Sequence, residues 1–153
     1  MSATCPICAS IAVLLTAGVG HSSEVAAFPV GVWLLNQTES KTLTKKVQAL
    51  HVLRDDGNTL AFTIVESVPG RPPRTISWSG DYGGAPRPVD GANETLRVDH
   101  RDGVITLTGS EIGGGRFAER CWIAPDKMRL GCDGLHWDAN GRQTDYREVY
   151  DRK

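Results

Sequence analysis

The sequence predicts an all-β protein in which a single antiparallel meander of about eight or nine strands closes into a barrel. Three dipeptides favour tight hairpin turns: Asp56-Gly57, Asp102-Gly103 and Asn140-Gly141. Residues 75–82 alternate strictly between apolar and polar side chains, which is typical of a strand buried on one face. Helical periodicity is almost absent after residue 30, and a chain of 153 residues is long enough for one core.

Each turn dipeptide fixes a pairing register, because a shift of one residue would send a whole strand's apolar set to the other face. At Asp102-Gly103 a two-residue loop places Val98 opposite Leu107 and His100 opposite Ile105. The same rule predicts two further sets of pairs: Leu53 with Leu60 and Ala49 with Ile64, and Leu135 with Tyr146 and Trp137 with Thr144.

Two cysteines lie in a further hairpin, with its loop at Asp126-Lys127. Its register places Cys121 directly opposite Cys132, where antiparallel Cα atoms are ~4.5–5.5 Å apart and a disulfide can form. The alternative is two buried free thiols that behave as small apolar residues. After Cys132 the apolar positions change parity, which predicts a bulge near Asp133-Gly134.

The charge of the chain is balanced, with 17 basic and 18 acidic residues and a formal net charge of -1. This balance gives no reason to expect nucleic acid or an anionic membrane surface as a partner. The motif Cys5-Pro6-Ile7-Cys8 resembles half of a zinc or redox site. No second pair of ligands accompanies it, and we expect no metal to bind there.

The first 27 residues are expected to be a signal peptide, and residues 28–153 the exported domain. Residues 11–19 form an apolar run of the right length, and Val25-Ala26-Ala27 offers small residues to a signal peptidase. The run is too short to span a bilayer, so we expect a periplasmic or secreted protein that does not insert in a membrane. Residues 1–10 contain no Lys or Arg, and the alternative is a buried N-terminal strand or helix.

Several motifs of the exported part resemble a widespread group of exported bacterial proteins without an assigned activity. The first is GVWLLN at residues 31–36, followed by Ser40-Lys41. The others are YGG at residues 82–84, leading to PVDG at residues 88–91, and a closing Tyr and Lys pattern over residues 146–153. The resemblance implies a lipocalin-like fold over nearly the whole exported part. The hairpin with the two cysteines is not part of the shared pattern.

The same resemblance implies a structural role for one tryptophan. In lipocalin-like barrels the tryptophan of the first motif plugs one end, and a basic side chain stacks on it. Trp33 matches that position, and Arg147 or Arg152 in the last strand would supply the cation.

The sequence contains no group of residues in a pattern typical of a catalytic site. Metal-binding histidine motifs, a nucleophile elbow and a phosphate-binding glycine loop are all missing from it. Asp55-Asp56, Asp99 and Asp102 flank turns, where Asp is favoured for local hydrogen bonds. We therefore expect no enzyme, no cofactor and no metal site.

Two functions remain, and both are compatible with a small barrel. The first is binding of a small apolar molecule inside the barrel, unless bulky side chains fill the interior. The second is action on another protein through the loops at residues 37–46 and 83–93, as small barrel inhibitors do. The inward residues expected to line a ligand site are Phe62, Ile64, Trp78, Tyr82, Leu96, Val98, Leu107 and Phe117.

Overall fold

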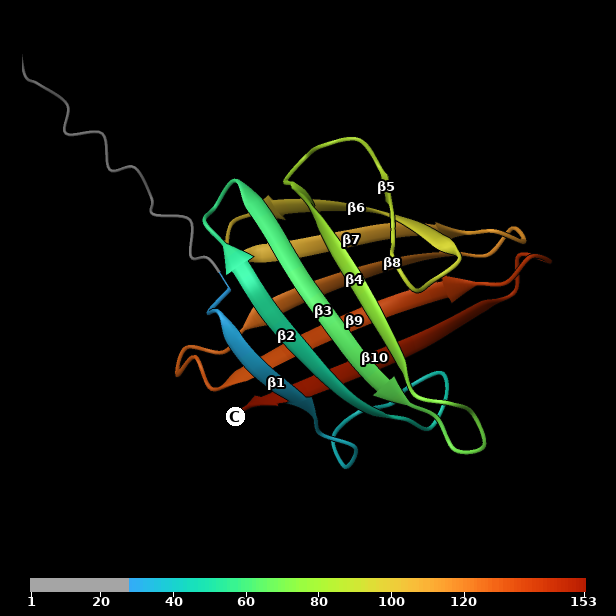
Figure 1. The fold of residues 1–153 in the computed structure, drawn as a ribbon, viewed down its shortest axis with the longest axis horizontal. Coiled ribbons are helices and arrows are strands. Elements are labelled where there is room, and N and C mark those ends of the chain that lie inside the picture. The colour runs from blue at the N-terminus through green and yellow to red at the C-terminus, as the bar shows by residue number, and fades with distance from the viewer. Residues whose placement is uncertain (1–27) are drawn as a thin grey trace, which may run out of the picture.

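Short β-rich runs joined by tight turns build an all-antiparallel barrel in the computed structural model, which describes residues 28–153 (Figure 1). The predicted signal peptide lies outside the described residues. Residues 28–153 contain no helix that is long and apolar enough to cross a membrane. The strands are β1 Gly31–Leu35, β2 Val47–Asp55, β3 Thr59–Ser67, β4 Arg74–Asp81, β5 Arg87–Pro88, β6 Glu94–Arg101, β7 Val104–Glu111, β8 Arg116–Ile123, β9 Arg129–Trp137 and β10 Gln143–Arg152.

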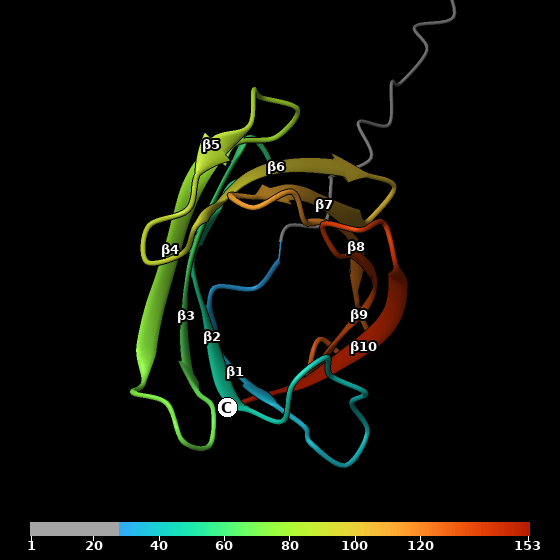
Figure 2. The ribbon, with the colours of Figure 1, turned by 90° about the vertical axis from the view of Figure 1, so that its right-hand side faces the viewer.

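The predicted all-β meander is confirmed, and the strands form a ring when viewed along the barrel (Figure 2). The sheet order is β4-β3-β2-β1-β10-β9-β8-β7-β6-β5, so β1 and β10, the first and last strands, pair side by side. Residues 28–153 contain ten strands rather than the predicted eight or nine. The additional one is β5, whose two residues have no alternating pattern to reveal them in the sequence.

The seam of the barrel is closed by the segment that contains β5. Arg87 and Pro88 pair with β6, while Asp90 forms a bridge to Ser77 of β4. Gly91 makes this approach possible, because a Cβ atom there would lie 2.1 Å from the carbonyl oxygen of Thr75. Its φ of +80° is also one that glycine adopts without strain.

Two of the predicted registers are confirmed. Val98 lies opposite Leu107, and His100 lies opposite Ile105. In the cysteine hairpin, Cys121 lies opposite Cys132 with Cα atoms 4.1 Å apart, and the two sulfur atoms are bonded.

The register predicted at Asp56-Gly57 is wrong. The Asp56 carboxylate accepts the backbone N–H groups of Asn58 and Thr59, which moves the turn along the chain. Asp55 therefore lies opposite Leu60, and a bulge between Val52 and Arg54 absorbs part of the shift. As a result Ala49 pairs with Val65 rather than Ile64, and Leu53 is 58% exposed on the outer face.

The register predicted at Asn140-Gly141 is wrong by one residue. The Asp138 carboxylate accepts the N–H groups of Asn140 and Arg142, so the loop is longer than two residues. Tyr146 lies opposite Gly134 instead of Leu135, and Trp137 lies opposite Gln143.

The bulge predicted near Asp133-Gly134 is also absent, since β8 and β9 pair without a break along their whole length. Gly134 and His136 therefore share the inner face with Cys132, while Leu135 and Trp137 point outward. The prediction assumed that the apolar side chains after Cys132 point inward. Trp137 is instead half-buried on the outer face, where the guanidinium carbon of Arg116 lies 4.8 Å from its ring centroid.

Trp33 is fully buried at one end of the barrel. The guanidinium carbon of Arg152 lies 5.6 Å from its ring centroid, and the indole N–H donates to the carbonyl of Pro29. Of the two arginines considered for this position, Arg147 lies elsewhere, 3.8 Å from Asp133 and largely exposed.

Candidate ligand cavity

The barrel interior contains two neighbouring spaces. The larger, which we call the outer chamber, has a volume of about 250 Å³ and lies where Leu43 and Lys46 enter the barrel. The smaller inner chamber has a volume of about 90 Å³ and reaches the Cys121–Cys132 disulfide. Six residues line both chambers and form what we call the neck: Gln48, Phe62, Ile64, Leu107, Glu119 and Glu148.

Two glycines make room for aromatic rings along the wall of the outer chamber. A Cβ atom at Gly134 would lie 2.1 Å from the ring of Tyr146, and one at Gly109 would lie 2.2 Å from the ring of Phe117. Each ring occupies the space that a side chain on the neighbouring strand would take. Both rings can therefore lie along the sheet rather than across the interior.

The structure brings five of the eight expected lining residues to the outer chamber: Phe62, Ile64, Leu96, Leu107 and Phe117. The other three do not line either chamber. Trp78 and Val98 are buried in the core, at 4% and 1% exposure. Tyr82 follows β4, and its hydroxyl donates to Asp55 over 2.8 Å.

The two loops considered for contact with another protein each contribute residues to the outer chamber. The segment at residues 37–46 contributes Leu43 and Lys46 to the outer chamber. The segment at residues 83–93 closes the seam, and its Val89 is 5% exposed and lines the same chamber.

Sequence reasoning missed the polar part of the lining. The outer chamber is lined by five glutamates, two fixed cations, a histidine and an amide: Glu66, Glu94, Glu111, Glu119, Glu148, Lys46, Arg74, His136 and Gln48. One signal could have found Glu119. Strand residues two apart share a face, so an inward Cys121 requires Glu119 to point inward as well.

Three of these carboxylates have a basic partner. Lys46 Nζ lies 2.6 Å from Glu148, His136 Nε2 lies 3.0 Å from Glu111, and Arg74 binds Glu66. Within residues 28–153, no basic side chain lies within 4 Å of Glu94 or Glu119, and neither carboxylate has a hydrogen-bond donor. These two are the carboxyl groups of the outer chamber without a basic partner.

A buried hydrogen-bond chain ends at the neck. The Tyr150 hydroxyl donates to Glu148, and Gln48 Nε2 donates to the Tyr150 oxygen over 2.7 Å. Because the single Tyr150 hydrogen is used by Glu148, Gln48 must present its N–H group to Tyr150. Gln48 is only 4% exposed, and its Oε1 atom has no hydrogen-bond partner among the described residues.

Burial changes the pKa of two side chains, Glu119 at the neck and Tyr150 next to it. It raises the pKa of Glu119 to about 8, and the negative charge of Glu148 adds to the shift while Lys46 opposes it. The pKa of Tyr150 is likewise raised by burial and by these two carboxylates.

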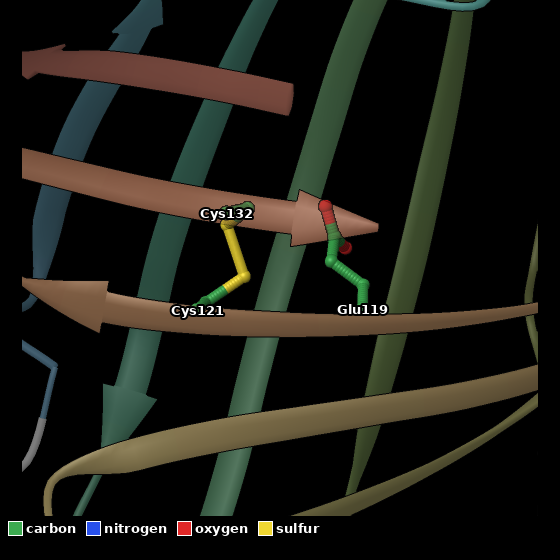
Figure 3. Close-up of side chains that lie close together, drawn as sticks. All are labelled: Glu119, Cys121 and Cys132. Atoms are coloured by element: carbon green, nitrogen blue, oxygen red, sulfur yellow. A yellow bond between two sulfur atoms is a disulfide. The ribbon is translucent and has the colours of Figure 1, made fainter. Parts of the chain in front are cut away.

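The Glu119 carboxylate lies beside the disulfide, with the closest ligand-type atoms of Glu119, Cys121 and Cys132 within 4.8 Å of one another (Figure 3). This spacing resembles a metal site. However, thiolates are the form of cysteine that binds metals, and here the two sulfur atoms are bonded to each other. The arrangement is therefore a carboxylate at the edge of an apolar disulfide.

Comparison with known proteins gives a fold but no family. No protein-family model matches the chain, and no curated protein matches it in sequence. Among solved structures, the chain is similar to secretory abundant heat soluble protein 4 from Ramazzottius varieornatus, with a TM-score of 0.56 and 11% identity. The match covers 81% of this chain and 94% of that one. At this identity the likeness shows the fold alone.

Proposed function

We propose that this protein binds a small, partly apolar molecule inside its barrel. The observation that carries the proposal is the pair of chambers joined by the neck, with volumes of about 250 and 90 Å³. Small-molecule sites combine apolar walls with polar groups that orient the ligand, and the two chambers together have both.

We further propose that the protein works outside the cytoplasm. The Cys121–Cys132 bond supports this, because disulfides persist in oxidising compartments. A secretory protein with the same fold also supports it.

The proposed activity is binding without chemical change of the ligand. Within the described residues, the outer chamber is lined by no Ser, Thr or Cys side chain. The inner chamber has only the two disulfide-bonded cysteines. A hydroxyl or free thiol nucleophile of Ser, Thr or Cys next to a base is thus missing from the lining formed by the described residues.

The test uses hexan-1-ol, a neutral probe with one polar end, titrated into the full chain by calorimetry. In Ile64→Trp a bulky ring enters the neck, and we expect binding to be lost. The matched control is Val65→Trp on the adjacent outward position, which is 41% exposed and should bind as the wild type does. Equal loss in both variants, or no binding by the wild type, would contradict the proposal.

A further inference from the structure

We propose that the ligand is an organic cation, a protonated amine with a short apolar chain, whose ammonium group binds at the neck between Glu119, Glu148 and the Gln48 amide oxygen. This inference rests on the proposed function and adds the chemical class of the ligand. Three separate features of the cavity support it.

The first feature is the balance of charge. Five carboxylates line the outer chamber against two fixed cations, and Glu94 and Glu119 have no basic partner among the described residues. A carboxylate ligand would bring another negative charge next to these carboxylates and be repelled. A cation would supply the basic partner that Glu94 and Glu119 lack when they are ionised.

The second feature is the set of hydrogen-bond acceptors. An ammonium group has three N–H donors and no acceptor. Gln48 Oε1 is buried and unpartnered, and the Glu119 carboxylate has no donor within residues 28–153. Glu148 Oε1 already accepts from Lys46 and can accept a second donor. All three side chains line both chambers and so belong to the neck.

The third feature is the apolar space behind the neck. Beyond its polar residues the inner chamber is lined by aliphatic and aromatic side chains and the disulfide, including Leu50, Val52, Leu60 and Leu130. The sulfur atoms lie close to the Glu119 carboxylate (Figure 3). An ammonium group held at the neck therefore has an apolar chamber within reach of its carbon chain.

Proton release should accompany binding. The charged groups around Glu119 are Glu148 and Lys46, and Tyr146 and Tyr150 face it from β10. Because the pKa of Glu119 is raised to about 8, a cation that binds the ionised carboxylate displaces a proton at neutral pH. Affinity for a permanent positive charge should then increase from pH 6 to pH 8.5.

The experiment compares three probes with the same chain: hexylammonium, hexan-1-ol and hexanoate. Each is titrated by calorimetry into the full chain at pH 8.5 and low salt, below the pKa of an alkylammonium, which is about that of lysine at 10.4. We expect hexylammonium to bind at least about tenfold more tightly than hexan-1-ol, and hexanoate to bind most weakly. Titration in two buffers of different ionisation enthalpy, at pH 7, should show proton release only for hexylammonium.

The variant Glu119→Gln keeps the size of the side chain and removes its charge. It should lose most of the preference for hexylammonium and still bind hexan-1-ol, which also shows that it is folded. The control is Glu39→Gln, which removes an exposed carboxylate outside the cavity and should leave the preference unchanged.

The outcomes separate this inference from the proposed function. If hexan-1-ol binds but hexylammonium binds no more tightly, or Glu119→Gln keeps the preference, the ligand class is wrong and the binding function stands. Tightest binding of hexanoate would also overturn the inference, since Glu119 would then be acting as a protonated donor. If none of the three probes binds, or hexylammonium binds Ile64→Trp equally well, both proposals fail.

Discussion

The ring of Tyr146 covers Gly134 so closely that a Cβ atom on the glycine would lie 2.1 Å from the ring. Tyr146 and Gly134 are directly paired on β10 and β9, and both face the interior. The glycine therefore determines where the tyrosine ring lies, and the ring in turn forms part of the wall of the outer chamber.

Gly134→Ala should push this ring from the wall and destabilise the protein. Forcing a methyl group into a packed position costs about 1–3 kcal/mol. Urea unfolding of the single variant measures this cost. In a Tyr146→Ala background the same methyl group should cost much less, and an equal cost in both backgrounds would show that the ring is not the obstacle.

Trp33→Ala should destabilise the protein by about 3–5 kcal/mol, the range for losing a buried aromatic side chain. Trp33 is fully buried under Arg152. Trp137 provides a matched control, because it also lies under an arginine but is half-buried on the outer face. Chemical denaturation of Trp137→Ala should show a clearly smaller loss. Similar losses for the two variants would mean that Trp33 is not the plug of the barrel.

The parts of the fold that the sequence predicted correctly depend on local rules. Val98 and Leu107 pair as expected because a two-residue Asp-Gly turn sets the register of its hairpin. The disulfide follows from the same kind of argument. At the other two turns the side chains of Asp56 and Asp138 bind backbone N–H groups and shift the loop, which no alternation pattern reveals.

The polar half of the candidate site was hidden for a different reason. Leu135 and Trp137 suggested that the inner face continues through them, although they pack on the outside. With that parity Gly134 and His136 would point outward. Glutamates on strands are normally solvent-exposed, and only their grouping in space shows that five of them face one cavity.

Glu119→Gln should change how stability depends on pH. The carboxyl group titrates at about pH 8 in the folded protein and at about 4.3 in an unfolded chain, so only the folded state holds its proton between these values. The contribution of this proton is complete below about pH 4.3 and is lost as the pH rises through about 8. The wild type should therefore lose stability relative to Glu119→Gln over this range, by at most about 1.4 kcal/mol for each pH unit.

Urea unfolding from pH 5 to pH 9 measures this difference. The cavity carboxylates other than Glu148, whose charge acts on Glu119, are present in both proteins, so their effects largely cancel. Glu39→Gln on the surface should give a curve parallel to that of the wild type. A difference between wild type and Glu119→Gln that does not change with pH would contradict the raised pKa.

A chain that begins at Phe28 should be at least as stable as the full chain. The backbone nitrogen of Phe28 lies 2.7 Å from Asp55 Oδ2. Cleavage after residue 27 would convert this N–H group into an ammonium group, and a charge-assisted hydrogen bond is stronger than a neutral one. Protein released with Phe28 as its first residue can be compared with the full chain by thermal unfolding at pH 6. Any gain should disappear in Asp55→Asn, and a truncated chain that fails to fold would refute the predicted boundary.

The Cys121–Cys132 bond should make a modest contribution to stability. It should also keep the inner chamber apolar. The two cysteines are 11 residues apart and already held together by their hairpin, so the bond should add about 2–3 kcal/mol or less. Cys121→Ser with Cys132→Ser should therefore fold and unfold at a lower urea concentration. The same change places hydroxyl groups in the inner chamber, and binding of hexan-1-ol should weaken. Thiol titration of the denatured, unreduced chain beginning at Phe28 should find no free thiol, whereas two free thiols would refute the bond and remove the main support for export.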